Sequence, residues 1–422
     1  MRLPCPVPLA AVLAIVAAGS AGAQAPQQAA SPPKAQAWID VATFSGLGMP
    51  AGLGAMSGGG GPMAALGSLF GGGGAKNTFG QTHGLSPGRW VDVTLRGSGP
   101  TGEAQLQVPP GFLSPALALV APQAAPATPV PEREPDDAVV EPHYERPRGK
   151  LLMYWGCGPT VRAGQPRVLD FATMSQADLG KFFVTRSATG RGAHSMPGRP
   201  LWPNPTDARM VPENASLAGA HQFGGGGVPD NFRFTLPAAQ DLMPALALQQ
   251  RADGGATELS WNAAPSARAY FVAAMGAAGG SAGEMVLWTS SEQPETGFGL
   301  VDYQGNAAID RWLREKVLLA PATTTCTVPA GVFAGAGAMV RLIGYGSELN
   351  LAYPPRPTDP RQRWNPDWAL KVRVKTVTQG MLGMTAGAAP AATGDAEPTP
   401  IEPPPEQKKP NAIDLLRGIL GR

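Results

Sequence analysis

Apolar and polar residues alternate over many short segments of this chain, and Gly or Pro residues separate one segment from the next. Alternation with a period of two is typical of strands, so the chain is predicted to be mainly β. Residues 37–44 (AWIDVATF) show the pattern and are expected to form a half-buried strand. The other strands predicted in the first half of the chain cover residues 89–95, 103–108, 115–120, 150–155, 167–171 and 232–236.

Residues 36–236 are predicted to form one irregular β-sandwich, because many short strands between Gly and Pro turns favour that architecture. A Gly-rich insertion at residues 45–75 and a Pro-rich, charged excursion at 121–148 interrupt it. Residues 175–183 are expected to form a short helix with Ser175 as its N-cap. Residues 186–229 are rich in Gly, Pro, Asn and Arg and are predicted to be a loop.

A second series of apolar segments begins at Pro244. It contains a Leu-x-Trp strand at Leu259 and a Tyr-centred strand at Tyr270, followed by an apolar turn, a long strand and a closing strand. The segments cover residues 244–248, 257–262, 269–272, 325–332, 339–346 and 370–375. This succession resembles a fibronectin type III domain over about residues 244–378. The resemblance implies a fibronectin type III/immunoglobulin-like sandwich at residues 240–380, so two β-sandwich-like domains are expected in all.

Two features depart from the pattern of that family. Ala336 to Met339 stand where the family often has a buried Tyr, and residues 307–319 (AAIDRWLREKVLL) are predicted to be an inserted amphipathic helix. The family is a scaffold for adhesion and spacing, so the resemblance implies no chemistry. The chain as a whole resembles exported bacterial proteins whose function is unknown, which implies a compartment and no mechanism.

Both ends of the chain carry processing or linker patterns. Residues 1–23 combine Arg2, a ten-residue apolar stretch and an A-x-A site, which predicts a cleaved secretory signal peptide and export to the periplasm or medium. Residues 24–35 and 386–410 are predicted to be a disordered leader and a disordered linker. Residues 411–422 are predicted to form an amphipathic helix, whose apolar face would contact the protein body, a partner or a membrane surface. That face carries Ile413, Leu416 and Leu420.

Composition narrows the class of protein further. The chain has 55 Gly and 46 Pro among 422 residues, about twice the usual share, and only 15% charged residues. These values exclude a coiled coil and a long helical bundle. The net charge of +2 gives no general attraction for nucleic acid, so no nucleic-acid partner is expected. No other stretch is long and apolar enough to predict a transmembrane helix.

Signal cleavage would remove Cys5 and leave Cys157 and Cys326. Two thiols in an oxidising compartment commonly pair, and the alternative is that each is buried separately and inert. The sequence does not decide between a disulfide and two free thiols, because the distance between the two Cα atoms decides it.

No catalytic, cofactor-binding or metal-binding constellation is identified. Residues 279–283 fit the letters of a GxSxG elbow, but the last histidine, His221, precedes them, and the order of an α/β-hydrolase triad therefore fails. The four histidines are scattered and show no zinc spacing. Asp302, before the predicted inserted helix, and Asp310, in its first turn, either face a cleft or lie on a solvated surface.

Residues 364–368 (WNPDW) provide the strongest ligand candidate. Trp364 and Trp368, with Arg363 beside them, would stack on sugar rings or anchor a partner, and the alternative is that both indoles cover the core. We therefore predict an exported, non-enzymatic envelope protein that acts as a binding or interaction module, without a cofactor, for a protein or envelope-polymer partner. The alternatives are an envelope polysaccharide hydrolase or carbohydrate-binding protein that uses an inter-domain cleft, and metal handling through Met49, Met56 and Met63.

Overall fold

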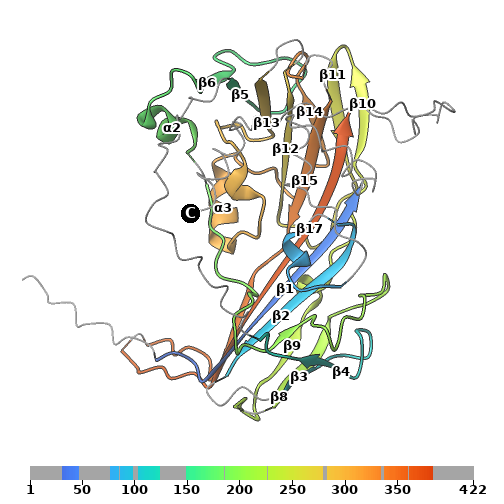
Figure 1. Ribbon diagram of the computed structural model, residues 1–422, viewed down its shortest axis with the longest axis vertical. Coiled ribbons are helices and arrows are strands. Elements are labelled where there is room, and N and C mark those ends of the chain that lie inside the picture. Colours follow the sequence, from blue (N-terminus) through green and yellow to red (C-terminus); the bar gives the residue numbers. More distant parts are fainter. Residues whose placement is uncertain are drawn as a thin grey trace, which may run out of the picture.

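The computed structural model describes residues 31–46, 77–84, 86–97, 103–123, 149–184, 186–225, 227–278, 283–333, 337–359 and 361–383 (Figure 1). Strands far outnumber helices, and the protein is mainly β, as the alternation predicted. The strands form three sheets. Within the described residues, no helix is both long and apolar enough to cross a lipid bilayer.

A ten-stranded sheet is the central element. Its neighbouring strands are antiparallel except for β1 with β17 and β5 with β13, which are parallel. In spatial order the strands are β6 (Arg167–Asp170), β5 (Lys150–Trp155), β13 (Glu284–Thr289), β12 (Ala269–Ala277), β15 (Ala338–Tyr345), β17 (Trp368–Leu382), β1 (Ala35–Gly46), β2 (Gly88–Arg96) and β7 (Leu201–Trp202). The tenth strand, β16 (Leu349–Tyr353), also pairs with β17.

Two smaller sheets pack on one face of the large sheet, to its right in Figure 1. One contains β10 (Gln249–Asp253), β11 (Ala256–Ser260) and β14 (Thr325–Val328). The other contains β4 (Ala116–Leu119), β3 (Ala104–Gln107), β8 (Gly219–Gly225) and β9 (Arg233–Leu236). Their side chains, such as Leu259 and Phe223, share one apolar core with Val93 and Val372 of the large sheet.

The other face of the large sheet is covered by helices and loops (Figure 1). Ile309 and Trp312 of α3 (Asn306–Arg314) pack against Phe44, Phe271 and Val377 of the sheet. The other helical elements of the described residues are α2 (Gln176–Phe182), η2 (Gln81–His83), η3 (Ala238–Gln240) and η4 (Phe298–Leu300). The central strands of the large sheet are therefore buried on both faces.

The large sheet crosses the domain boundary predicted at residues 236–240. Strand β1 pairs along its whole length with β17, and β5 pairs with β13, so strands from the first predicted domain lie on both sides of those from the second within one sheet. The fold therefore does not divide into two separate sandwiches. Parallel pairing between segments more than 300 residues apart leaves no mark in the local alternation of either segment, which is why the sequence suggested two units.

Of the three predicted helices, the two that fall on described residues are present, and one of these is shorter than expected. Ser175 accepts a hydrogen bond from the Asp178 backbone N–H, and the Asp178 side chain accepts one from the Ser175 backbone, so α2 begins with a capping box. Helix α3 ends at Arg314, whereas the prediction extended to residue 319. Lys316 has a φ of 58°, a left-handed conformation that stops the helix and turns the chain back.

Several strands were missed. Residues 186–229 contain β7 and β8 although a loop was predicted, and β13 and β16 were not predicted at all. The apolar segment 244–248 has no regular structure, and β10 begins only at Gln249. Strand β8 has three Gly in seven residues, so its pairing with β3 and β9, and not its own composition, makes it a strand.

Cys157 and Cys326 form a disulfide, with an S–S distance of 2.05 Å and Cα atoms 5.2 Å apart. Of the two alternatives that the sequence left open, pairing is the one found. The bond joins the turn after β5 to strand β14, and so ties the large sheet to a small one. Backbone bonds reinforce it on either side, with Gly158 N donating to Thr327 O (2.9 Å) and Ala330 N to Pro159 O (3.0 Å).

Some predictions fall on residues outside the described part of the chain. These are the signal peptide, most of the leader, the Gly-rich insertion and the Pro-rich excursion, the linker, and the C-terminal helix with Ile413, Leu416 and Leu420. At the end of the predicted leader, Lys34 pairs with Asp367, and Ala35 already opens β1.

Candidate functional site

The second face of strands β1, β2 and β17 carries charged side chains that the fold buries. On β17, Arg373 and Lys375 alternate with Val372, so the cations lie on the face opposite the main core. Asp40 of β1 lies directly across from Arg373. The prediction of a half-buried strand over residues 37–44 is therefore wrong about this second face, which loops cover.

Asp40 and Arg373 form a buried two-point ion pair. Arg373 Nε donates to Asp40 Oδ1 (2.7 Å) and Nη2 donates to Oδ2 (2.5 Å), and both side chains are almost fully buried. The Ala193 backbone N–H also donates to Oδ2 (2.9 Å), and Arg373 Nη1 donates to Gly190 O (2.8 Å). Burial alone would raise the pKa of Asp40, but the hydrogen bonds from Arg373 and His83 outweigh it and lower that pKa.

The loop that covers this pair depends on a glycine. A Cβ on Gly192 would overlap Arg373 Nη2 and Asp40 Oδ2, so any larger residue would push the loop away from the pair. The loop is tied to its neighbour by Gly305 N donating to Ala188 O (3.1 Å). Covering the pair in this way excludes water from it, which strengthens the attraction between the two charges.

A second ion pair lies next to the first and involves a histidine. Lys375 Nζ donates to Asp302 Oδ1 (3.1 Å), and His83 Nδ1 lies 3.3 Å from the same oxygen. His83 Nε2 lies 3.7 Å from Asp40 Oδ2, so the imidazole bridges two carboxylates. The Tyr303 ring lies against both cations, 4.3 Å from Arg373 Cζ and 4.2 Å from Lys375 Nζ. We call Asp40, His83, Asp302, Arg373 and Lys375, with Tyr303, the charged cluster.

A third carboxylate, that of Asp92, positions His83 through the turn that carries it. Asp92, beside Asp40 on β2, accepts hydrogen bonds from the backbone N–H groups of Gly80 (3.0 Å) and Thr82 (3.3 Å) and from the Thr82 hydroxyl. It therefore fixes the η2 turn that carries His83. Burial raises the pKa of Asp92 to about 6, in spite of these hydrogen bonds.

The pKa values of His83 and Lys375 are shifted in opposite directions, by hydrogen bonds to carboxylates in the first case and by burial in the second. Burial would lower the pKa of His83, but hydrogen bonds to Asp302 and Asp40 outweigh it and raise the value to about 9. Burial lowers the pKa of the Lys375 amine to about 8, although Asp302 favours its charged form. Burial would raise the pKa of Asp302, but His83 and Lys375 lower it well below its usual range.

Every charge of the cluster faces an opposite charge inside the fold. Asp40, Arg373 and Lys375 are inaccessible to a substrate, and only His83 (41% of its side chain) and Asp302 (28%) reach the surface. Both nitrogens of His83 already face carboxylates. This geometry suits a structural role, in which the cluster holds loops onto the sheet, better than it suits acid–base catalysis. Catalysis of that kind needs a group that is free to exchange a proton with a ligand.

Substituting His83 with Gln is expected to weaken the dependence of stability on pH. Histidine titrates near 6.5 in the unfolded chain and near 9 in the fold, so the folded state binds more protons, and stability falls as pH rises through this range. Lys375 acts in the opposite sense above pH 8, because its folded pKa lies below 10.5. The urea midpoint of the natural protein should therefore be lower at pH 8 than at pH 6.5, and the difference should be smaller for H83Q. An equal difference in the two proteins would contradict the interaction of His83 with the two carboxylates.

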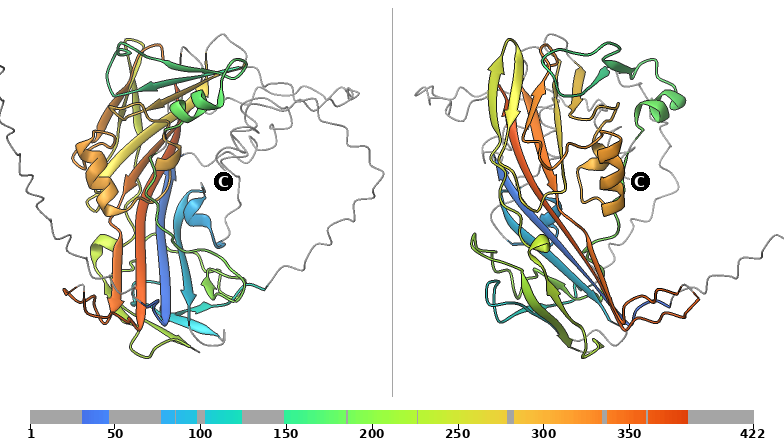
Figure 2. Two further views of the ribbon diagram at one scale, coloured as in Figure 1. Left: turned by 90° about the vertical axis from the view of Figure 1, so that its left-hand side faces the viewer. Right: turned by 180° about the vertical axis from the view of Figure 1, so that it is seen from behind.

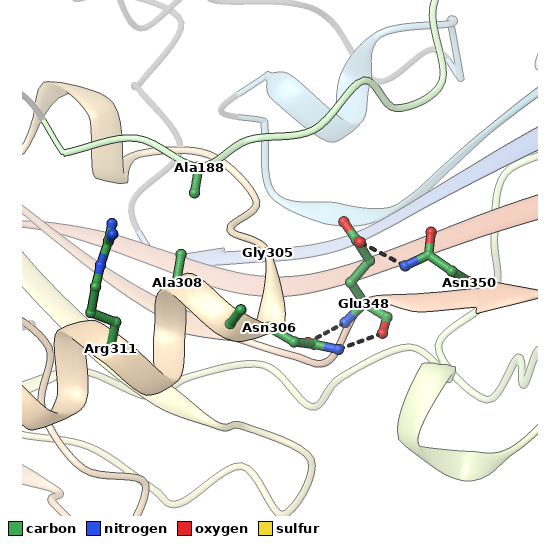
Figure 3. Close-up of a pocket in the computed structure, with 8 residues that line it drawn as sticks. Ala188, Gly305, Asn306, Ala308, Arg311, Glu348 and Asn350 are labelled. Atoms are coloured by element: carbon green, nitrogen blue, oxygen red, sulfur yellow. Dashed lines mark hydrogen bonds between the residues drawn. The ribbon is translucent and has the colours of Figure 1, made fainter. Parts of the chain in front are cut away.

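A pocket of about 490 Å³ lies beside the first turn of α3 (Figure 3). Asn306 Nδ2 donates to the Glu348 backbone O (2.8 Å), and the Glu348 N–H donates to Asn306 Oδ1 (2.9 Å). The Glu348 carboxylate faces Asn350 Nδ2 (2.7 Å) and Lys371 Nζ (3.6 Å). Glu348 is the one carboxylate among the lining residues, whereas glycoside hydrolysis needs two. This pocket does not supply the pair that the hydrolase alternative requires.

The two tryptophans predicted as ligand contacts have different environments. Trp368 is the first residue of β17, is 5% exposed and stacks on Phe232 with ring centroids 4.6 Å apart. It belongs to the core. Trp364 is half-buried in the loop before β17, where its Nε1 donates to Pro354 O (2.9 Å) and Arg356 lies 5.6 Å from its ring centroid. Arg363 beside it is exposed.

The fold also brings to this site Tyr353, which precedes residues 364–368 in the sequence and was not among the predicted contacts. Tyr353, the last residue of β16, is 48% exposed and stacks on Trp368 with ring centroids 6.1 Å apart and planes 17° apart. The loop of residues 354–367 that follows it projects beyond the lower end of the large sheet (Figures 1 and 2). The clue in the sequence was the aromatic Tyr353 directly before Pro354 and Pro355, but only pairing of β16 with β17 places it against Trp368.

The other candidate residues are dispersed. Asp310 pairs with Arg268 on the surface, whereas Asp302 pairs with Lys375 in the charged cluster. The contacts of the described residues therefore do not bring the two carboxylates together. His194 lies edge-on to Trp38, and His221 stacks on Phe234 in the core. Across the described ranges, no group of three or more His, Cys, Asp or Glu side chains is placed to hold a metal ion.

Comparison with known proteins adds no family to these observations. No protein-family model matches the chain, and no curated protein sequence is significantly similar to it.

Proposed function

We propose that this chain is an exported, non-enzymatic protein of the cell envelope that binds a partner or an envelope polymer through Tyr353 and the 354–367 loop. The observation that carries the proposal is the exposed Tyr353 ring at the end of a stack of aromatic side chains, next to a projecting loop with three arginines. Tyr, Trp and Arg are the residues that contribute most binding energy at interfaces.

Export is supported by two independent features. The first 23 residues have the three-part pattern of a signal peptide. The disulfide between Cys157 and Cys326 is of a kind that persists in oxidising compartments and is rare in the cytosol. The C-terminal segment, with Ile413, Leu416 and Leu420, stays a predicted second contact for a partner or a membrane surface.

A binding role is favoured over hydrolysis by the chemistry of the two polar sites. The charged cluster is mostly buried and each of its charges faces an opposite charge, and the pocket at α3 offers a single carboxylate. The 354–367 loop, by contrast, presents exposed side chains and projects from the body (Figure 2).

We also propose that residues 249–382 are fibronectin type III/immunoglobulin-like. An immunoglobulin-like sandwich places its first, second and fifth strands in one sheet and its third, sixth and last strands in the other. Counted from β10, strands β10, β11 and β14 form one sheet here, and β12, β15 and β17 lie side by side in the other. Strands β1 and β2 on one side and β5 and β6 on the other would then be additions to the second sheet.

Co-sedimentation with isolated envelope tests the binding function. The purified protein is expected to pellet with envelope from its own source, and a Y353A/W364A variant should lose at least tenfold in affinity, a loss typical of hot-spot side chains. A chain ending at Ala386 should keep the loop-dependent binding. Failure of every form to pellet, or equal pelleting of the natural protein and Y353A/W364A, would overturn the proposed function.

A further inference from the structure

The rings of Phe232, Trp368 and Tyr353 form a continuous stack that leads from the core to the surface. Phe232 and Trp368 are nearly parallel, with planes 9° apart, and Trp368 is fixed further by its Nε1, which donates to Asn231 O (2.9 Å). Tyr353 lies on the outer side and is half-exposed. Its ring is therefore held in one orientation before any ligand arrives, which reduces the entropy lost on binding.

The 354–367 loop next to it is also stiff. Of its residues 354–359 and 361–367, four are prolines, each of which fixes its own φ. Its base is closed where the Asp367 backbone N–H donates to Tyr353 O (2.6 Å), and Lys34 Nζ donates to Asp367 Oδ1 (2.7 Å). The loop presents its side chains from a restrained backbone.

Positive charge on this loop is available to a ligand. Arg356, Arg361 and Arg363 are exposed, and among the described residues none of the three makes an ion pair. Of the two acidic side chains, Asp367 pairs with Lys34, whereas Asp359 is exposed and its Oδ1 accepts a hydrogen bond from the Arg361 backbone N–H (2.9 Å), which leaves three arginines against one exposed carboxylate. The loop therefore offers guanidinium groups that fit carboxylate or phosphate oxygens.

The other residues of the 354–367 loop favour a polar ligand. Residues 354–367 include no Val, Ile, Leu, Met or Phe, so the loop offers aromatic rings, prolines and polar side chains but no aliphatic patch. An exposed ring at the base of a loop that carries exposed arginine and amide side chains matches a sugar polymer with hydroxyl and carboxylate groups.

We infer that Tyr353 and the 354–367 loop bind an acidic polysaccharide, with a sugar face on the Tyr353 ring and uronate carboxylates on Arg361 and Arg363. This inference rests on the proposed function and names the class of its ligand. A protein partner at the same loop is the competing outcome of the test.

Binding to polygalacturonate, measured by calorimetry or by affinity electrophoresis, tests the inference. Neutral dextran and poly-glutamate, which has carboxylates but no sugar rings, are the comparison polymers. The protein is expected to bind polygalacturonate at least tenfold more tightly than either, and the binding should weaken with added salt because exposed charges are screened.

Matched variants separate the two contributions. Y353A should reduce affinity for polygalacturonate at least tenfold, whereas Y353F, which keeps the ring, should bind nearly as the natural protein does. R361A/R363A should reduce affinity and also remove most of its salt dependence. R314A removes an exposed arginine on α3 and should change nothing. Arg361 and Arg363 are exposed, so their double variant should keep the natural melting temperature.

Other outcomes would overturn the inference. Equal binding to dextran would exclude a role for charge, and equal binding to poly-glutamate would exclude a role for the sugar ring. Envelope binding that protease treatment of the envelope abolishes would identify a protein partner, so that the inference fails while the proposed function stands. Absence of binding to envelope and polygalacturonate alike would overturn both.

Discussion

Replacing Arg373 with Ala is expected to destabilise the protein by about 3–5 kcal/mol, the usual cost of removing one partner of a buried ion pair. Arg373 supplies two of the hydrogen bonds to Asp40 and holds the 188–194 loop through Gly190 O. Without it the Asp40 carboxylate stays buried with His83 and the Ala193 N–H as its remaining partners. Urea denaturation at pH 7 measures the effect.

The neighbouring Lys371 provides the control. It lies on the same face of β17, two residues away, and pairs with Glu348 at a more exposed position. K371A should therefore cost about 1 kcal/mol or less. A D40A/R373A variant should be destabilised by less than the sum of the two single variants, since the second substitution removes a charge that the first left unpaired. A cost for R373A no greater than that for K371A would show that the pair does not stabilise the fold.

The charged cluster shows where local patterns stop being informative. The alternation in residues 37–44 and 370–375 predicted strands β1 and β17, and both are present. The same alternation is produced by a strand whose polar face is exposed to solvent and by a strand whose polar face is covered by loops. Only the parallel register that sets Asp40 opposite Arg373 distinguishes the two cases, and that register joins positions 333 residues apart.

The aromatic site gives a similar lesson on a smaller scale. The sequence grouped Trp364 with Trp368 because they are close along the chain, and offered ligand contact and core packing as alternatives for both. In the fold Trp368 belongs to the core, and the exposed ring next to it is Tyr353, 15 residues earlier. Pairing of β16 with β17 creates this neighbourhood, and short-range spacing contains no information about it.

Turns and caps, by contrast, could be predicted because their physics is local. Ser175 followed by Asp178 defines the start of α2 within four residues, and the capping box forms. The end of α3 was misplaced because an apolar run continues to residue 319. Val317 and Leu318 are buried after the helix has ended, so their apolar character reports core packing and not helical periodicity.

Removal of the disulfide is expected to cost about 2–5 kcal/mol. The bond spans 169 positions, so it restricts the unfolded chain strongly, and Cys326 lies in the apolar core next to Leu259 of β11. A C157A/C326A variant should have a lower melting temperature than the natural protein. Alanine is preferred to serine because it places no hydroxyl in the core.

Reduction supplies the matched comparison. Dithiothreitol should lower the melting temperature of the natural protein towards that of C157A/C326A and leave the variant unchanged. The exported chain should show no titratable thiol before reduction and two after it, since signal cleavage would remove Cys5. Because the bond ties the turn after β5 to β14, its loss should loosen that end of the large sheet while the 354–367 loop, at the opposite end in Figure 1, keeps its ligand affinity. A reduced protein that lost stability and polygalacturonate binding together would show that the two ends are coupled, and a natural protein with two free thiols would contradict the bond itself.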